Sequence, residues 1–420
     1  MTLHVGWVFA AMVASFALLH FALRSPLPIS LIVISILGAL LAGFGVPFRH
    51  LVEGGFGYLN LILALFAGAF FGQAMRQSGA TEALADFVAA RERRFSPLLL
   101  AGALLFVTGM FTGIAGVAVL AVGAFAAPLL VRVAGLSPPL AAAYIALFGM
   151  LGMIAPPLNV PAMIMADGVN MPFAGFDGSL WALSLPSALF ALLTFMRHIG
   201  PASLPPTAPA PSSVWSRLGI AVLVAIIAFW GLLRYWPGLL FDPSIALVLV
   251  VGGAVVMFAA GRRGWTDVTR SVFSGTPLLL AAILVTVGVL VQIMALTGIR
   301  GWLVIQAMSF GSPWNNAALV SIPLLGSVLT SMGTANSLGV PFAFAFIHQD
   351  MILNISALSA ISALSEFCPP TAIATALSAY VVGEERLWPI IRASLPTLAV
   401  LTALALLMLM FAPALAPYLR

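Results

Sequence analysis

Two proline pairs interrupt long apolar stretches of this sequence, Pro156-Pro157 in the first half and Pro369-Pro370 in the second. A proline pair inside an apolar helix removes two backbone donors and disfavours helix at the residue before it. In a bilayer the freed carbonyls need partners, so such breaks line cavities or lie inside protein. They can hold ions with carbonyl groups and anions with helix N-termini. A plain proline kink is the alternative at either pair, and two pairs at matching places favour binding sites.

Polar and small residues accompany both breaks. Asn159 follows the first pair, and Ser365 and Thr371 flank the second. Two clusters lie upstream: Thr112, Gly113 and Gly116 in the first half, and Thr330, Ser331, Gly333, Thr334 and Asn336 in the second. Hydroxyls, an amide and exposed carbonyls are hard oxygen ligands, which predicts substrate or ion contacts, with Na⁺ at the Thr112–Gly116 and Thr330–Asn336 breaks. Helix packing through small residues is the alternative at both clusters, and the richer second cluster favours binding.

Glu366 is the sharpest single candidate for ion coupling. It lies three residues before Pro369 in a segment otherwise free of charge. A carboxylate within a membrane span is expensive and usually marks an ion or proton path. The alternative is a protonated side chain that only bonds a neighbouring helix.

The elements that position these residues are expected to be membrane helices. The 420 residues are 62% hydrophobic and 7% charged, against about 25% charged in a soluble domain. No Asp, Glu, Lys or Arg occurs at 95–131, 301–349 or 393–419, and about 20 apolar helical residues cross a bilayer. The composition therefore predicts an all-α polytopic membrane protein. The net charge of +5 comes from arginines whose only cluster, Arg91–Arg94, fits a membrane flank better than a nucleic-acid surface.

A Pro/Ser-rich linker at 201–213 divides the sequence into two halves, 1–200 and 214–420. Two patterns recur in the same order in both halves. Gln73 to Gly79 resembles Gln292 to Gly298, and Pro128 precedes Pro156 by the same spacing as Pro341 precedes Pro369. This predicts an internal repeat of the kind common in secondary transporters.

The arginines predict how the halves are oriented. With the N-terminus outside and the linker inside, ten arginines face the cytoplasm and three face outward. The ten are Arg24, Arg76, Arg91, Arg93, Arg94, Arg197, Arg217, Arg262, Arg263 and Arg270, and the three are Arg49, Arg234 and Arg300. The positive-inside rule supports this arrangement, in which the second half is inverted relative to the first.

At these residues the sequence resembles the large membrane subunit (DctM-like) of tripartite ATP-independent periplasmic (TRAP) transporters, within the ion transporter superfamily. The resemblance covers nearly the whole chain and is carried by moderately specific motifs. They are Gly68 to Gly79, Gly113-Ile114-Ala115-Gly116 followed by Pro128, Pro138-Pro139, Gly152 to Pro157, and Cys368-Pro369-Pro370-Thr371.

The resemblance implies an inverted-repeat, elevator-type transporter with two re-entrant helical hairpins in a bacterial-type inner membrane, where lipid surrounds it. The first hairpin and its clamp would be Thr112 to Gly116 with Pro156, Pro157 and Asn159. The second would be Thr330 to Asn336 with Ser365, Pro369, Pro370 and Thr371. The implied ligands are sodium and a small organic anion such as a dicarboxylate. The implied partners are a small membrane subunit and a periplasmic solute-binding protein, and a homo-oligomer is also open.

The chain departs from the family pattern at Ile114, Ala115, Leu158 and Glu366, and these departures leave Na⁺ and H⁺ both open as the coupling ion. The expected function is cation-coupled uptake of a small organic anion without any other cofactor. The alternative is a single-component symporter or a cation/proton antiporter of the same superfamily, without a binding-protein partner. An intramembrane enzyme is not expected, because neither His-Glu-x-x-His nor Gly-x-Ser-x-Gly occurs. A channel, which would show flux without saturation, is also disfavoured.

Overall fold

The computed structural model describes residues 4–90, 96–199, 214–235, 243–259, 264–309, 321–346 and 350–419. The linker predicted at 201–213 lies outside these residues, as do the Arg91–Arg94 run, Arg262 and Arg263. The described residues are helical with short connections, as the composition predicts, and contain no strand.

The first half is a series of short and long helices. In order they are α1 (Val5–Ala17), α2 (Leu27–Leu41), α3 (Phe48–Phe56), α4 (Leu59–Gln77), α5 (Ala80–Ala89), α6 (Pro97–Thr112), α7 (Ala115–Pro128), α8 (Pro138–Ile154), α9 (Val160–Gly168) and α10 (Asp177–Met196). Turns of π-helix, Leu18–Ala22 (η1) and Leu129–Val133 (η2), continue α1 and α7.

The second half follows a similar order. It contains α11 (Val214–Tyr235), α12 (Ile245–Ala259), α13 (Trp265–Val272), α14 (Gly275–Leu296), α15 (Ile299–Ser309), α17 (Ser321–Gly326), α18 (Thr330–Thr334), α19 (Val340–Ala345), α20 (Met351–Ala363), α21 (Ile373–Val382), α22 (Leu387–Met410) and α23 (Ala412–Leu419). A π-helical turn, Ala335–Gly339 (η3), separates α18 from α19, and a 3₁₀ turn, Leu364–Phe367 (η4), ends α20.

Among the described residues, six helical stretches are long and apolar enough to cross a membrane. They are Val5–Ala22, Phe48–Gln77, Ala115–Val133, Asp177–Met196, Trp265–Leu296 and Leu387–Met410. Large apolar side chains such as Trp7, Phe48 and Phe258 are exposed on the outer helices, where a soluble protein would seldom place so many. The chain is therefore a multi-pass membrane protein, as the sequence predicts.

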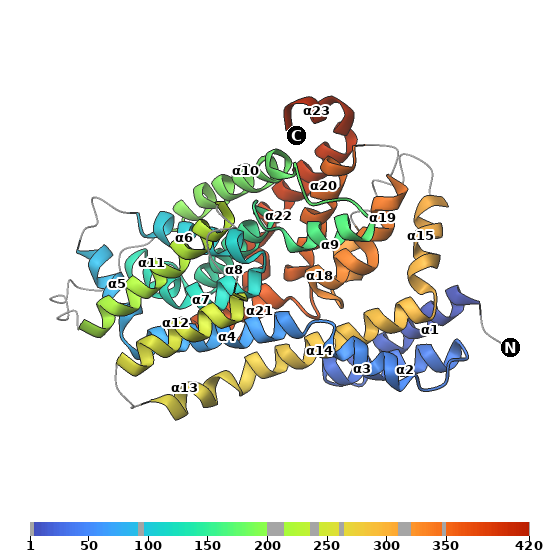
Figure 1. Ribbon diagram of the computed structural model, residues 1–420, viewed down its shortest axis with the longest axis horizontal. Coiled ribbons are helices and arrows are strands. Elements are labelled where there is room, and N and C mark those ends of the chain that lie inside the picture. The colour runs from blue at the N-terminus through green and yellow to red at the C-terminus, as the bar shows by residue number, and fades with distance from the viewer. Residues whose placement is uncertain are drawn as a thin grey trace.

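The two halves contact each other in exchanged pairs. Helix α14 of the second half packs on α2 and α3 of the first, while α4 of the first half packs on α12 and α13 of the second. Likewise α9 packs on α20 and α21 packs on α8. Helix α10 packs directly on α22, opposite the edge of the molecule where α4 and α14 lie (Figure 1). Each contact thus has a counterpart with the halves interchanged.

The centre of the protein consists of α7 and α8 from the first half and α20 and α21 from the second. Nearly all residues of α7, α8 and α20 are buried, and α21 packs against both α7 and α8. Small residues permit this close approach: a side chain at Gly116 would lie 2.9 Å from a methyl carbon of Leu377. These four helices carry both predicted breaks, so the core of the fold and the candidate site coincide.

Candidate functional site

The first predicted cluster forms the tip of a helical hairpin. Helices α6 and α7 pack together and are joined by Gly113 and Ile114. Gly113 ends α6 in the left-handed conformation, with φ of 63°. The Thr112 hydroxyl donates to the carbonyl of Thr108 at 2.8 Å, so its hydrogen bond is made within the helix. Thr112 and Gly113 therefore shape the tip through the backbone.

The first proline break lies against this tip. Pro156 and Pro157, joined by a cis peptide bond, separate α8 from α9. A side chain at Gly113 would come within 2.9 Å of the Leu158 carbonyl oxygen, just after the break. The tip of the first hairpin and the first break thus form one unit, as the sequence predicts.

Asn159 fixes the broken helix. Its Oδ1 accepts from the backbone N–H of Ala162 at 2.9 Å, which is a helix N-cap. Its Nδ2 donates to the Ile154 carbonyl and to the Ser359 hydroxyl of α20, both at 3.1 Å. These bonds occupy the amide, so Asn159 joins the two halves at the break.

Replacing Gly113 with alanine should lower the thermal stability of the protein more than the matched change at Gly383. Both glycines have positive φ, 63° and 82°, where any L-residue costs roughly 1–2 kcal/mol. A methyl group at Gly383 meets nothing within 4 Å, whereas at Gly113 it would meet Leu158 and Val160. Overpacking adds about 1–3 kcal/mol. The unfolding temperatures of both variants in detergent measure this difference, and equal shifts would contradict a close contact between tip and break.

The second hairpin tip lies slightly earlier in the chain than the second polar cluster. Residues 327–329 connect α17 to α18, and Thr330 begins α18 with φ of 64°. The cluster from Thr330 to Asn336 therefore runs along α18 and η3. The second tip also contacts its break: Thr371 donates to the Ser327 carbonyl through its hydroxyl at 2.5 Å and its N–H at 3.2 Å. Pro369 and Pro370, again joined by a cis bond, lie directly before Thr371.

Glu366 is buried at the second break and is held by both arms of the site. Its Oε1 accepts a short hydrogen bond from the Ser331 hydroxyl of α18. Its Oε2 accepts from the backbone N–H of Ala374, in the first turn of α21, at 3.1 Å. The carboxyl group therefore bridges the second hairpin and a helix N-terminus, where a negative charge is stabilised.

A small closed cavity adjoins the Glu366 carboxyl group. It has a volume of about 20 Å³, room for a single water molecule or ion. Its polar lining consists of Glu366, Ser331 and Thr330, and the Thr330 hydroxyl is buried without a partner. Apolar side chains line the rest, and Glu366 is the only ionisable residue among the lining. A buried hydroxyl without a partner beside an acidic group is an arrangement that a bound cation or water would complete.

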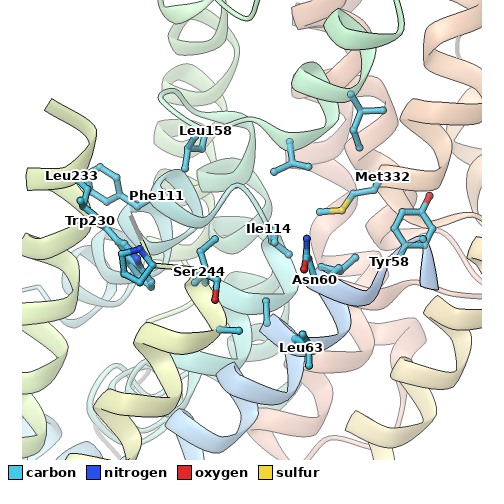
Figure 2. A pocket seen from close by; sticks show the side chains of 18 residues that line it. Tyr58, Asn60, Leu63, Phe111, Ile114, Leu158, Trp230, Leu233, Ser244 and Met332 are labelled. Carbon is cyan, nitrogen blue, oxygen red and sulfur yellow. The ribbon is translucent and has the colours of Figure 1, made fainter. Parts of the chain in front are cut away.

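A much larger cavity, of about 690 Å³, lies beside the first hairpin tip. Figure 2 shows Trp230 and Leu233 at one end and Tyr58 and Met332 at the other, with Ile114 of the tip between them. The lining comes from both halves: α4, α11 and α12 on one side and the first hairpin, α9 and α18 on the other. The Tyr58 hydroxyl and the Trp230 indole N–H are buried without partners. A mostly apolar cavity with a few polar groups is typical of a small-molecule site.

The large and the small cavity share three lining residues, Leu61, Ile114 and Met332. These side chains alone separate a space of ligand size from the space beside Glu366. A third cavity, of about 300 Å³, lies at the second hairpin tip and is lined by Pro369, Pro370 and apolar residues of α1, α2 and α14. Each hairpin tip therefore borders a cavity on its outer side.

The remaining predicted residues lie in the same region. Ser365 and Thr334 donate to carbonyls, of Ser362 at 2.7 Å and Thr330 at 2.5 Å. Gly333 lies under Tyr58, since a side chain there would come within 3.3 Å of the Tyr58 hydroxyl. Gly116 lines the small cavity, while Asn336 contacts neither cavity. The structure thus gathers these residues around the two cavities, although several of their side chains are already engaged within the protein.

Arg300 contacts the second cluster, a position that sequence reasoning missed. Its Nη2 donates to both the backbone carbonyl and the Oδ1 of Asn336, each at 2.7 Å. Arg300 had been assigned to the outer flank of a span. One signal could have found it, because it is the only Asp, Glu, Lys or Arg within 271–349.

No protein-family model matches this chain, and no curated protein matches it. The resemblance to TRAP transporters therefore stays a prediction, and function is argued from the two cavities and the residues around them.

Proposed function

We propose that this protein is a secondary active transporter that takes up a small organic anion, such as a carboxylate, together with Na⁺ or H⁺. The observation that carries the proposal is the pair of adjoining cavities. One has the size of a small molecule, the other has the size of an ion and contains the buried carboxyl group of Glu366. Coupled transport needs two ligands bound close enough for one to affect the other, and a partition of three side chains provides that proximity.

The arrangement of the halves supports an inverted-repeat transporter with two re-entrant hairpins. The reciprocal contacts, α14 with α2 and α3 and α4 with α12 and α13, are those expected of two related halves around a two-fold axis. Each tip packs on the break of its own half, Gly113 on Leu158 and Ser327 on Thr371. The positive-inside pattern supports opposite orientations of the halves in the membrane.

The large cavity also supports an elevator motion. It lies between the first hairpin with α9, a candidate moving part, and the long helices α4, α11 and α12, a candidate scaffold. An interface that encloses a cavity of about 690 Å³ has fewer apolar contacts to break when one part slides past the other. In this proposal the hairpins, the breaks and Glu366 move together and carry the bound anion and cation.

Uptake into proteoliposomes tests the proposal. Purified protein should accumulate a radiolabelled carboxylate, tested with acetate, succinate and citrate, when a Na⁺ or H⁺ gradient is imposed, and uptake should saturate. Liposomes without protein and liposomes with dissipated gradients are the controls. Uptake that never depends on either gradient, for any of the carboxylates tried, would rule the proposal out.

A cation/proton antiporter is a second candidate, and Glu366 is the observation that favours it. A single buried carboxyl group beside an ion-sized space could bind Na⁺ and H⁺ in turn. The two functions differ in a direct measurement. An antiporter moves protons in response to added Na⁺ without any carboxylate present, as an internal pH dye would report, whereas a symporter needs the organic anion.

A further inference from the structure

Arg300, the second residue of α15, holds a cation against the second hairpin without an acidic partner. The side chain is half-buried, and its Nη2 donates to two neutral oxygens of Asn336. Within the described part of the chain, Arg49, Arg132 and Arg386 form ion pairs, whereas Arg300 forms none. Its positive charge is therefore not neutralised by the described residues.

The guanidinium group also keeps unused donors. Arginine presents five N–H donors in a planar fork that matches a carboxylate. At Arg300 only Nη2 makes hydrogen bonds to the described residues, which leaves the donors on Nε and Nη1 available. Retaining a half-buried cation with unused donors in a membrane protein is costly unless a ligand supplies the missing negative charge.

The position of Arg300 connects it to the large cavity. Asn336, its partner, lies about one helical turn after Met332, which lines the cavity. Tyr58 lines the same end of the cavity, and its buried hydroxyl, which has no partner, lies over Gly333 between these two residues. A cation with unused donors and a hydroxyl without a partner thus lie at one end of a ligand-sized space.

We propose that Arg300 and Tyr58 recognise the carboxylate group of the transported anion. The guanidinium supplies charge and a two-point hydrogen bond, and the Tyr58 hydroxyl supplies a third donor. The apolar remainder of the cavity, toward Leu233 and Trp230, would receive the carbon skeleton. This inference rests on the proposed function and assigns the anion-binding end of its cavity.

A structural role for Arg300 makes a different prediction. A π-helical turn such as η3 frees a backbone carbonyl, and the bond from Arg300 to the Asn336 carbonyl satisfies one. If that were its only role, replacing Arg300 would lower stability and leave ligand affinity unchanged. Arg76 provides the matched control, because its Nη2 also donates to a backbone carbonyl, that of Val381, at 2.7 Å.

The experiment compares the thermal stabilisation of purified Arg300→Gln, Arg76→Gln and unsubstituted protein by ligands. The ligands are acetate, succinate and citrate, with acetamide and succinamide as neutral analogues. Carboxylates, but not amides, should stabilise the unsubstituted protein and Arg76→Gln. In Arg300→Gln the apparent affinity for the carboxylates should fall at least tenfold, as expected when a charged hydrogen-bonded contact is lost. Tyr58→Phe should produce a smaller loss in the same direction.

The outcomes separate the inference from the proposed function. If Arg300→Gln binds carboxylates as tightly as Arg76→Gln does, the inference is wrong and the proposed function stands. If no carboxylate stabilises the unsubstituted protein and none is taken up under either gradient, the proposed function fails as well. Arg300→Lys keeps the charge and one bond to Asn336, so it provides a folded variant if the glutamine substitution does not fold. Its affinity should be intermediate, and an unchanged affinity would overturn the two-point contact.

Discussion

Glu366→Gln is expected to abolish uptake driven by a cation gradient, with initial rates at least tenfold below those of the unsubstituted protein. Glutamine has nearly the shape of glutamate and can still accept one of the two hydrogen bonds from Ser331 and the Ala374 N–H. It cannot carry a negative charge or exchange a proton. Because Glu366 is the only ionisable residue lining the small cavity, the coupling cation loses its counter-charge there. Initial rates under imposed Na⁺ and H⁺ gradients measure the effect.

The same variant identifies the coupling ion. If Na⁺ is coupled, the dependence of uptake on Na⁺ should disappear, and if H⁺ is coupled, the dependence on pH should disappear. Exchange of labelled for unlabelled anion, which needs no net cation movement, should survive better than net uptake. Glu384→Gln is the control, because Glu384 follows α21, pairs with Arg386 and lines neither cavity. Unchanged gradient dependence in Glu366→Gln would show that Glu366 only caps α21.

Local chemistry determined how well the candidate site could be predicted from the sequence. Pro156-Pro157 and Pro369-Pro370 mark helix ends wherever they occur, so the breaks after α8 and η4 were predictable. Glu366 was predictable because burial of a lone carboxyl group in an apolar segment has few explanations. Each of these signals depends on a few neighbouring residues.

Contacts between distant segments were not predictable in the same way. The bond between Arg300 and Asn336 depends on how α15 turns back toward η3, and no sequence pattern encodes that angle. The second hairpin was expected to break at Thr330 because its polar residues are concentrated there. The tip lies at residues 327–329, since those polar residues instead bond along α18, as Thr334 does to Thr330.

The large cavity depends on packing and could not have been predicted at all. Its lining combines Tyr58 and Leu61 of the first half with Trp230 and Ser244 near the ends of α11 and α12. These residues carry no motif, and their convergence follows from the packing of α12 on α4. The same packing gives the proposal its strongest test, because it brings Ile114 of the hairpin tip into the cavity.

Attaching a bulky group at Ile114 is expected to block both ligand binding and uptake almost completely. Ile114 lies at the hairpin tip and lines both cavities, so a large group there would occupy the anion space and press on the partition beside Glu366. Cys368 is the only cysteine, so Cys368→Ala gives a background without thiols. In that background, Ile114→Cys should be active and should lose more than about nine-tenths of its uptake after reaction with a bulky maleimide, as expected for a filled binding site.

Protection by ligand makes this test specific to the cavity. Carboxylates that are transported should slow the reaction of Ile114→Cys with the maleimide, because anion and reagent compete for the same space. Leu247→Cys is the matched control: Leu247 is exposed and follows Ala246, which lines the cavity, but does not line it itself. Its modification should leave uptake intact and should be insensitive to carboxylates. Full activity after complete modification at Ile114→Cys would mean that the anion binds elsewhere, and the cavity between the first hairpin and α4, α11 and α12 would then not be the transport site.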